Sequence, residues 1–219
     1  MWNQIFNPQN GFFQTIDLLF NLFMLSLIWA VLCIPVFTIG PATAALYYVL
    51  VKCIRRKEPY PFKNFLESFR ANFKVGALAS LVCALVASAA WEGVQVLWQA
   101  TCTGSAAGRL MLVIYGVVVL LLLGTLGYLF PLLSRFSFGT KRLFLTAFQL
   151  ALRHLPVTML LAVILAASIF VSAVFLFPVL FMPALTGLVC SLPLERVFRR
   201  YTPPEGGMEE GEDRPWYLR

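Results

Sequence analysis

Residues 110–133 read LMLVIYGVVVLLLLGTLGYLFPLL, a stretch without a single charged side chain. At a rise of 1.5 Å per residue, a helix over this stretch is about 36 Å long. The hydrocarbon core of a bilayer is about 30 Å thick. The stretch therefore predicts a transmembrane helix, and it determines how the rest of the chain is interpreted.

The composition of the whole chain also indicates lipid as its solvent. Of 219 residues, 60% are hydrophobic and 12% are charged, and the mean hydropathy is +0.81. Soluble domains are roughly 45–50% apolar and about 25% charged, and a soluble domain of this size cannot bury so much apolar surface. We predict an all-α fold, that of a polytopic helical membrane protein.

Apolar stretches divide the chain into about six predicted membrane segments. The predicted segments are 17–36, 41–54, 75–98, 110–133, 155–177 and 183–195. Four are long, whereas 41–54 and 183–195 are short helices that begin with Pro-Ala. Since a complete crossing needs about 20 residues, each short helix either crosses with its neighbours' help or re-enters on the side it came from.

Two further segments have the periodicity of amphipathic helices. In 61–74 the apolar stripe is Phe62, Phe65, Leu66, Phe69 and Phe73. In 139–153 one side carries Leu143, Phe144, Ala147, Phe148, Ala151 and Leu152. A basic helix with an apolar face lies in the headgroup plane of a membrane, so we predict two interfacial helices. For 61–74, packing on a protein core is the alternative.

The basic residues predict the topology. They gather in 52–74, 135–153 and 196–200, and loops rich in Lys and Arg stay in the cytoplasm. All three stretches reach one side only if both short helices cross the bilayer, so charge favours crossing and places both termini in the cytoplasm. Residues 202–219 hold half of the ten acidic residues and are rich in Pro and Gly, which predicts a disordered cytoplasmic tail.

The same cations predict the partner of this face. A formal net charge of +7 can indicate nucleic-acid binding, but here the cations adjoin apolar spans, so the lipid bilayer is the expected partner and nucleic acid is not. The residues expected at the membrane surface or against a protein partner are Arg55, Arg56, Lys63, Arg70, Lys74, Lys141, Arg142, Arg199 and Arg200.

Polar residues within predicted spans are candidates for a binding site. An ionisable side chain at mid-span costs about 2.5–3.5 kcal/mol on insertion scales. Asp17 stands at a predicted span start, where it can cap the helix, and Asn21 follows one turn later. Glu92 lies near the predicted outer interface, where it either reaches water or binds a solute or proton.

The two short helices share a sequence pattern. Both Pro41-Ala42-Thr43-Ala44-Ala45-Leu46 and Pro183-Ala184-Leu185-Thr186-Gly187-Leu188 read P-A-x-x-[AG]-L. The match is either a degenerate internal repeat or a chance similarity of apolar sequence. Because interrupted helices in corresponding halves often form a midplane site, Pro41 and Pro183 join the candidate binding residues. A small solute transporter or channel is accordingly one functional hypothesis.

Motifs of catalysis are missing from the sequence. The chain has one histidine and five cysteines without metal-ligand spacing, and it contains no nucleotide-binding or hydrolase motif. We therefore expect no metal, no cofactor and no enzymatic activity.

Four segments of the chain carry a family resemblance. They are GPATAALYY at 40–48, FLESFRANFK at 65–74, ALRHLP at 151–156, and Pro183-Ala184 followed by ERVF at 195–198. Together they resemble the YesL-like family of bacterial integral membrane proteins, whose function is unknown. The resemblance extends over roughly residues 5–201. It implies a bacterial plasma membrane and a context of carbohydrate uptake, so our favoured hypothesis is a non-enzymatic accessory to a carbohydrate ABC importer.

Overall fold

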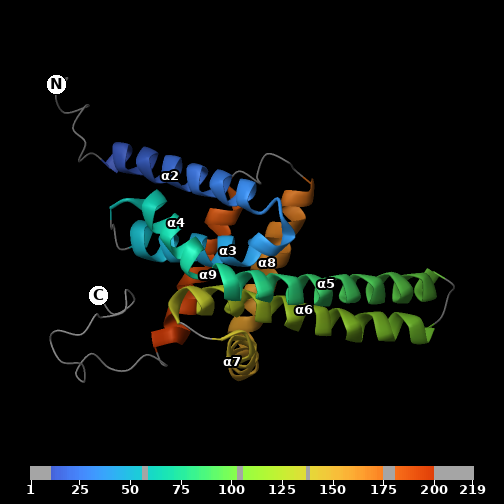
Figure 1. Ribbon diagram of the computed structural model, residues 1–219. Helices are drawn as coiled ribbons and strands as arrows, with labels where there is room; N and C mark the ends of the chain where they lie inside the picture. Colours follow the sequence, from blue (N-terminus) through green and yellow to red (C-terminus); the bar gives the residue numbers. More distant parts are fainter. Residues whose placement is uncertain (1–10, 56–58, 103–105, 137–138, 175–180, 200–219) are drawn as a thin grey trace.

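A computed structural model of the chain is drawn in Figure 1, and it describes residues 11–55, 59–102, 106–136, 139–174 and 181–199. The elements are α2 (Gly11–Leu32), η1 (Val36–Thr38), α3 (Ile39–Val49), η2 (Leu50–Arg55), α4 (Pro61–Ala71), α5 (Phe73–Cys102), α6 (Ala106–Arg135), α7 (Thr140–Arg153), α8 (Leu155–Val174) and α9 (Met182–Arg199). All elements in these ranges are helical, which confirms the predicted all-α class.

Four helical stretches are long and apolar enough to cross a membrane. They are Val36–Arg55, Phe73–Cys102, Ala107–Arg135 and Leu155–Val174. Three of them correspond to the predicted spans 75–98, 110–133 and 155–177. The fourth contains the short segment predicted at 41–54, which proves longer than expected because the 3-10 turn η1 and the π-helical turn η2 extend α3 at both ends.

The first predicted span has different limits in the structure. Helix α2 runs from Gly11 to Leu32, whereas the sequence predicted 17–36. It ends before Pro35, because a proline disfavours helical geometry in the residue preceding it. Asp17 therefore lies in the second turn of α2 and does not begin it, so the prediction that Asp17 caps this helix is wrong. The predicted tail, 202–219, lies outside the described residues.

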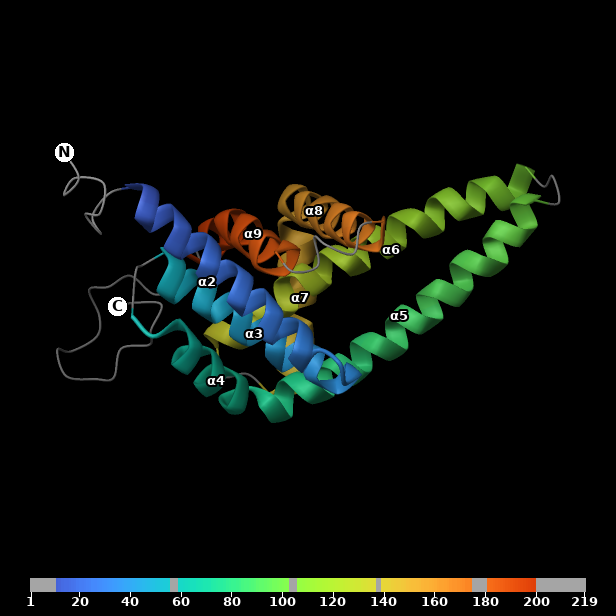
Figure 2. The same ribbon diagram turned by 90° about the horizontal axis from the view of Figure 1, so that it is seen from above.

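The helices form a compact base from which one hairpin extends (Figures 1 and 2). Helices α5 and α6 pack side by side in opposite directions and reach well beyond the other helices. Helix α3 lies at the centre of the base, in contact with α2, α4, α5, α6 and α9. This position explains why α3 is the most completely buried helix, with Ala42, Ala44 and Ala45 fully inaccessible.

The apolar interior of the base has two parts. One gathers around Tyr128, Leu129 and Leu132 of α6, against α3, α7 and α9. The other gathers around Leu25 of α2 and Leu50, and includes the fully buried Phe65 of α4. Since α3 contributes to both, it connects the two parts.

Both amphipathic helices form. Helix α4 packs on α3 through the buried Phe65 while Phe62 and Leu66 are exposed, so it contacts the core and retains an outward apolar surface. It ends at Ala71, and Lys74 belongs to α5.

In α7 the predicted apolar side is only partly buried. The buried residues are Leu143, Ala147, Leu150 and Ala151. Phe148 and Leu152, on the predicted apolar side, are half exposed, so α7 packs on its neighbours with only part of that side. Helical spacing alone does not say where along an apolar stripe the neighbouring helices sit.

The start of α3 packs directly on the backbone of α5. The Gly40 N–H donates to Ser80 Oγ at 2.6 Å, and the Ser80 hydroxyl donates to the Gly76 carbonyl at 2.9 Å. A Cβ atom at Gly76 would lie only 2.9 Å from Pro41 Cδ. Small residues permit such close helix crossings in membranes, and this crossing requires glycine at position 76.

We expect Gly76→Ala to destabilise the protein by roughly 1–3 kcal/mol, because the added methyl group overpacks the crossing with Pro41. Gly116→Ala is the matched control, since a Cβ atom at Gly116 of α6 meets nothing within 4 Å. Denaturation of the purified protein in detergent measures both effects. Equal unfolding midpoints for the two variants would contradict the described crossing.

Candidate functional site

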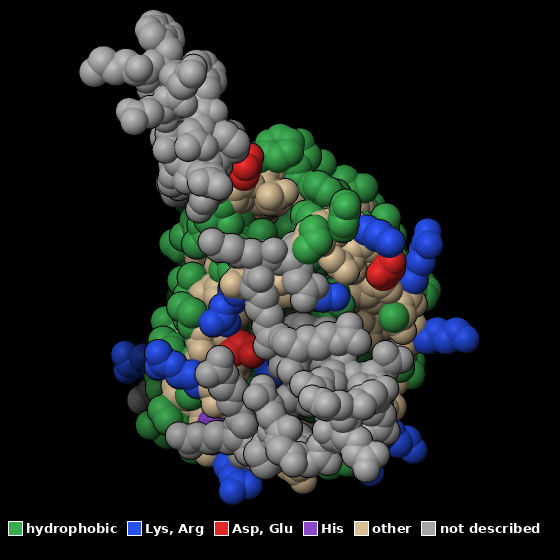
Figure 3. All heavy atoms as spheres, turned by 90° about the vertical axis from the view of Figure 1, so that its left-hand side faces the viewer, with side chains coloured by type: hydrophobic (Ala, Val, Ile, Leu, Met, Phe, Trp, Pro, Cys, Tyr) green, Lys and Arg blue, Asp and Glu red, His purple; other side chains and the backbone are tan. Residues whose placement is uncertain are grey.

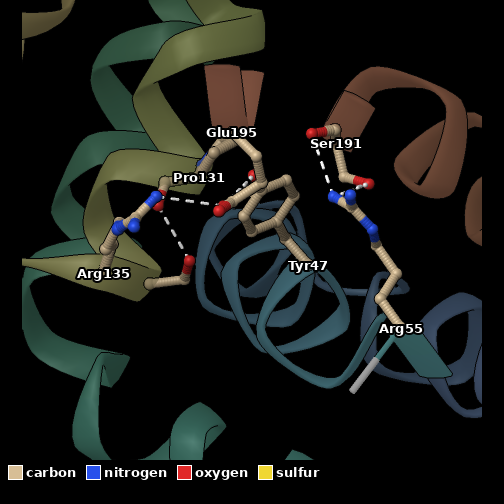
Figure 4. Close-up of polar contacts among 7 residues, drawn as sticks. Tyr47, Arg55, Pro131, Arg135, Ser191 and Glu195 are labelled. Carbon is tan, nitrogen blue, oxygen red and sulfur yellow. Dashed lines mark hydrogen bonds and ion pairs between the residues drawn. The ribbon is translucent and has the colours of Figure 1, made fainter. Parts of the chain in front are cut away.

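A cluster of buried polar side chains lies where α3, α6 and α9 meet (Figure 4). Arg135 Nη1 lies 3.1 Å from Glu195 Oε1, and the Tyr47 hydroxyl donates to the same oxygen at 3.2 Å. The side chains of Arg135 and Glu195 are 2% and 11% exposed. The cluster thus joins three segments that are far apart in the sequence.

The two charged residues of the cluster belong to different helices, α6 and α9. Arg135 is the last residue of α6, where Ser134 donates a hydrogen bond to the Pro131 carbonyl at 2.8 Å. On α9, Glu195 and Phe198 are three residues apart and share one face of the helix. The Phe198 ring lies 5.3 Å from the Arg135 guanidinium carbon, within the range of a cation–π interaction. Helix α9 therefore contacts this cation with both a carboxylate and an aromatic ring.

A second polar link joins the two Pro-Ala helices. Arg55 Nη1 donates to the carbonyl oxygen and the hydroxyl of Ser191, at 3.3 and 3.2 Å. A Cβ atom at Gly187 of α9 would collide with the Leu50 side chain of η2, so α9 and η2 are in close contact here as well. The helices that share the P-A-x-x-[AG]-L pattern are therefore neighbours in space.

The electrostatics of the cluster favour a structural role for its charges. Taking a charge out of water is costly unless it is paired and hydrogen-bonded. Among the described contacts, the Arg135 cation meets the Glu195 carboxylate, and Tyr47 supplies a further hydrogen bond to that carboxylate. The pair is electrically neutral as it stands, and its geometry couples α3, α6 and α9 to one another.

The structure does not gather the predicted binding residues into one site. Asp17 is exposed on α2, Glu92 is exposed on α5, and Asn21 is half buried. Pro41 is buried at the crossing with α5. Pro183 lies in the first turn of α9, where the next residue, Ala184, donates its N–H to Ser26 Oγ at 3.3 Å.

The predicted surface cations gather at one end of the molecule. Figure 3 looks onto the end opposite the far end of the α5–α6 hairpin, and Lys and Arg side chains are spread over it. Those that the structure describes as exposed are Arg55, Lys63, Arg70, Lys74, Lys141 and Arg142. Lys63 lies 3.9 Å from Glu67 in an exposed pair. Arg56, Arg200 and the side chain of Arg199 lie outside the described residues.

Sequence reasoning missed the buried cluster, although a signal for it was present. Glu195 is the only acidic residue between Glu92 and Glu205, and it stands beside Arg196 in an otherwise basic stretch. An isolated acid at the end of an apolar segment needs a cation inside the protein. Nothing in the sequence says that this cation is Arg135.

Comparison with known proteins gives a family match for part of the chain. Residues 22–91 match a family described as "Protein of unknown function, DUF624". The matched segment runs from α2 into α5 and includes the crossing at Gly76. No curated protein and no solved structure matches the chain. Within the described residues, no three His, Cys, Asp or Glu side chains are grouped as metal ligands would be.

We expect Glu195→Leu to cost about 3–5 kcal/mol of stability, because Arg135 then stays buried without its carboxylate. Arg135→Met should have a similar cost, because Glu195 then stays buried without its cation. The double variant Arg135→Met/Glu195→Leu removes both charges and should be much more stable than the sum of the single effects predicts. Denaturation in detergent gives all three values.

Lys63→Gln provides the control for this cycle, because the exposed Lys63–Glu67 pair contributes about 0.5 kcal/mol or less. Additive effects at Arg135 and Glu195 would show that the two residues do not interact energetically.

Proposed function

We propose that this chain is a multi-pass protein of a bacterial plasma membrane that catalyses no reaction and acts as an accessory to a carbohydrate ABC importer. The resemblance to YesL-like proteins supports this setting. The four helices able to span a membrane support the location. The neutral, closed ion pair of Arg135 and Glu195 supports a structural function for the ionisable core.

The orientation that we propose places the basic end and both termini in the cytoplasm. The exposed cations of α4 and α7 support it, since cytoplasmic loops carry the excess of Lys and Arg. The far end of the hairpin then lies outside. Cys102, which is exposed at the end of α5, marks that side.

In intact cells, an impermeant thiol reagent should label a variant that retains Cys102 as its only cysteine. A variant whose only cysteine is introduced by Lys141→Cys should react only after the membrane is permeabilised. Labelling of the second variant in intact cells would refute this orientation.

One observation carries the accessory role: the hairpin is longer than a bilayer is thick, and toward its far end it exposes large apolar side chains beside the polar Gln95, Gln99 and Arg109. Helices α5 and α6 have 30 residues each, about 45 Å of helix, against about 30 Å of hydrocarbon. From Lys74 to Glu92 the chain already rises about 27 Å. Residues 93–102 and 106–114, which we call the hairpin tip, then reach beyond the hydrocarbon.

The hairpin tip has the character of a contact surface. Val96, Leu110 and Val113 are 66%, 66% and 68% exposed, and Trp98 is 59% exposed. Exposed apolar patches of this kind mark sites of protein interaction. We propose that the tip packs against the external side of the importer's permease subunits, because a partner in the same membrane can cover this surface along its length.

Affinity purification of the tagged protein from native membranes in mild detergent should recover the permease subunits. Leu110→Gln should reduce that recovery roughly tenfold, as expected for a residue at the centre of an interface. Leu66→Gln, an equally polar change of an exposed leucine on α4, should leave it unchanged. Recovery of no importer subunit, together with normal sugar uptake in a deletion strain, would refute the accessory role.

A second function is favoured by a different observation, the contact between α3 and α9. If these helices are corresponding parts of an internal repeat, their interface is where a small transporter would bind its solute. Solute flux into vesicles that contain only the purified protein would favour transport over the accessory role. The accessory role predicts no flux and no effect of Glu92→Gln on importer recovery.

A further inference from the structure

Helices α5 and α6 enclose a groove on the side of the molecule. The two helices meet near the hairpin tip and splay apart toward the base, as Figure 2 shows. Between them lies a groove of about 890 Å³, with α7 and α8 also contributing to its walls. Val86 and Trp91 of α5, Leu126 of α6, and Phe144 and Phe148 of α7 line it.

The lining has almost no polar character. Thr125 contributes the only hydroxyl group, and this hydroxyl donates to the Leu121 carbonyl at 2.9 Å. Water in a cavity needs two to four polar partners, and these walls do not supply them. The walls of the groove therefore favour hydrocarbon over water as its occupant.

Two cations stand at the start of α7, one helical turn before the residues of α7 that line the groove. Lys141 and Arg142 are exposed in the first turn of α7, and no acidic residue stands in that turn. Lys141 precedes Phe144, Leu145 and Phe148 by three, four and seven residues, so it lies on the same helix face as the groove lining. This face of α7 thus changes from cationic at Lys141 to apolar at Phe144 within one helical turn.

We propose that the groove binds an anionic phospholipid, with its phosphate at Lys141 and Arg142 and its acyl chains between α5 and α6. The charge pattern matches such a molecule, whose negative headgroup adjoins its hydrocarbon. A second copy of this chain matches less well, because symmetric pairing of identical surfaces would bring two sets of these cations together. The inference requires a bilayer around the protein and does not depend on any importer.

Trp91 reports directly on the occupant because it lines the groove. Bromine atoms on an acyl chain quench tryptophan fluorescence on contact. The full-length protein is reconstituted in phosphatidylcholine vesicles that contain a minor fraction of acyl-brominated lipid, either phosphatidylglycerol or phosphatidylcholine. The difference between the wild type and Trp91→Phe isolates the signal of Trp91 from that of the other tryptophans.

Brominated phosphatidylglycerol should quench Trp91 at a roughly tenfold lower mole fraction than brominated phosphatidylcholine, given two cations near the headgroup. Lys141→Gln/Arg142→Gln should abolish this preference. Lys63→Gln/Arg70→Gln, which removes two exposed cations from α4, should leave it intact. Because all four positions are exposed, we expect these variants to fold, and circular dichroism verifies this.

Three outcomes would overturn the proposal. Equal quenching by the two brominated lipids in the wild type would show that the headgroup is not recognised. A preference that survives Lys141→Gln/Arg142→Gln would place the headgroup elsewhere. If neither lipid quenches Trp91, and quenching appears only when the protein is diluted in the vesicles, a second copy of the chain occupies the groove.

Discussion

The buried ion pair of Arg135 and Glu195 limits how the helices in the base of this protein can pack together. Where water is excluded, neither charge is tolerable alone, so α6 and α9 can pack only in an arrangement that brings the two together. The Tyr47 hydroxyl adds α3 to the same carboxylate. Three helices that meet only through apolar side chains could slide along one another, and these polar contacts oppose sliding.

A second constraint fixes the other end of α3. Its start touches the backbone of α5, where Pro41 meets Gly76 and the Gly40 N–H meets Ser80. Helix α3 is therefore held at its start by close packing and further along by hydrogen bonding. In the far half of the α5–α6 hairpin the two helices contact each other closely, because the Tyr115 hydroxyl donates to the Ala90 carbonyl at 3.3 Å and a Cβ atom at Gly93 would collide with Tyr115.

The sequence predicted those features that a short window determines. The charge-free stretch 110–133 lies within α6, and the aromatic spacing in 61–74 produced α4. Features that depend on distant partners were missed, since Tyr47 and Glu195 are 148 residues apart and Arg135 and Glu195 are 60 apart. Asp17 illustrates the opposite error. The sequence predicted that its carboxylate caps the first helix, but α2 begins at Gly11, six residues earlier.

The shared pattern of the two Pro-Ala helices has a physical explanation that does not require common ancestry. A helix leaves its first N–H groups without partners, and hydrocarbon offers none. Proline in the first turn removes one such donor, and a serine of a neighbouring long helix accepts another, Ser80 from Gly40 and Ser26 from Ala184. Small residues one turn later, such as Gly187, then admit the opposing helix. Proline followed by small residues is thus the sequence expected wherever a helix begins against other helices inside lipid, and the resemblance of the two segments follows from that shared demand.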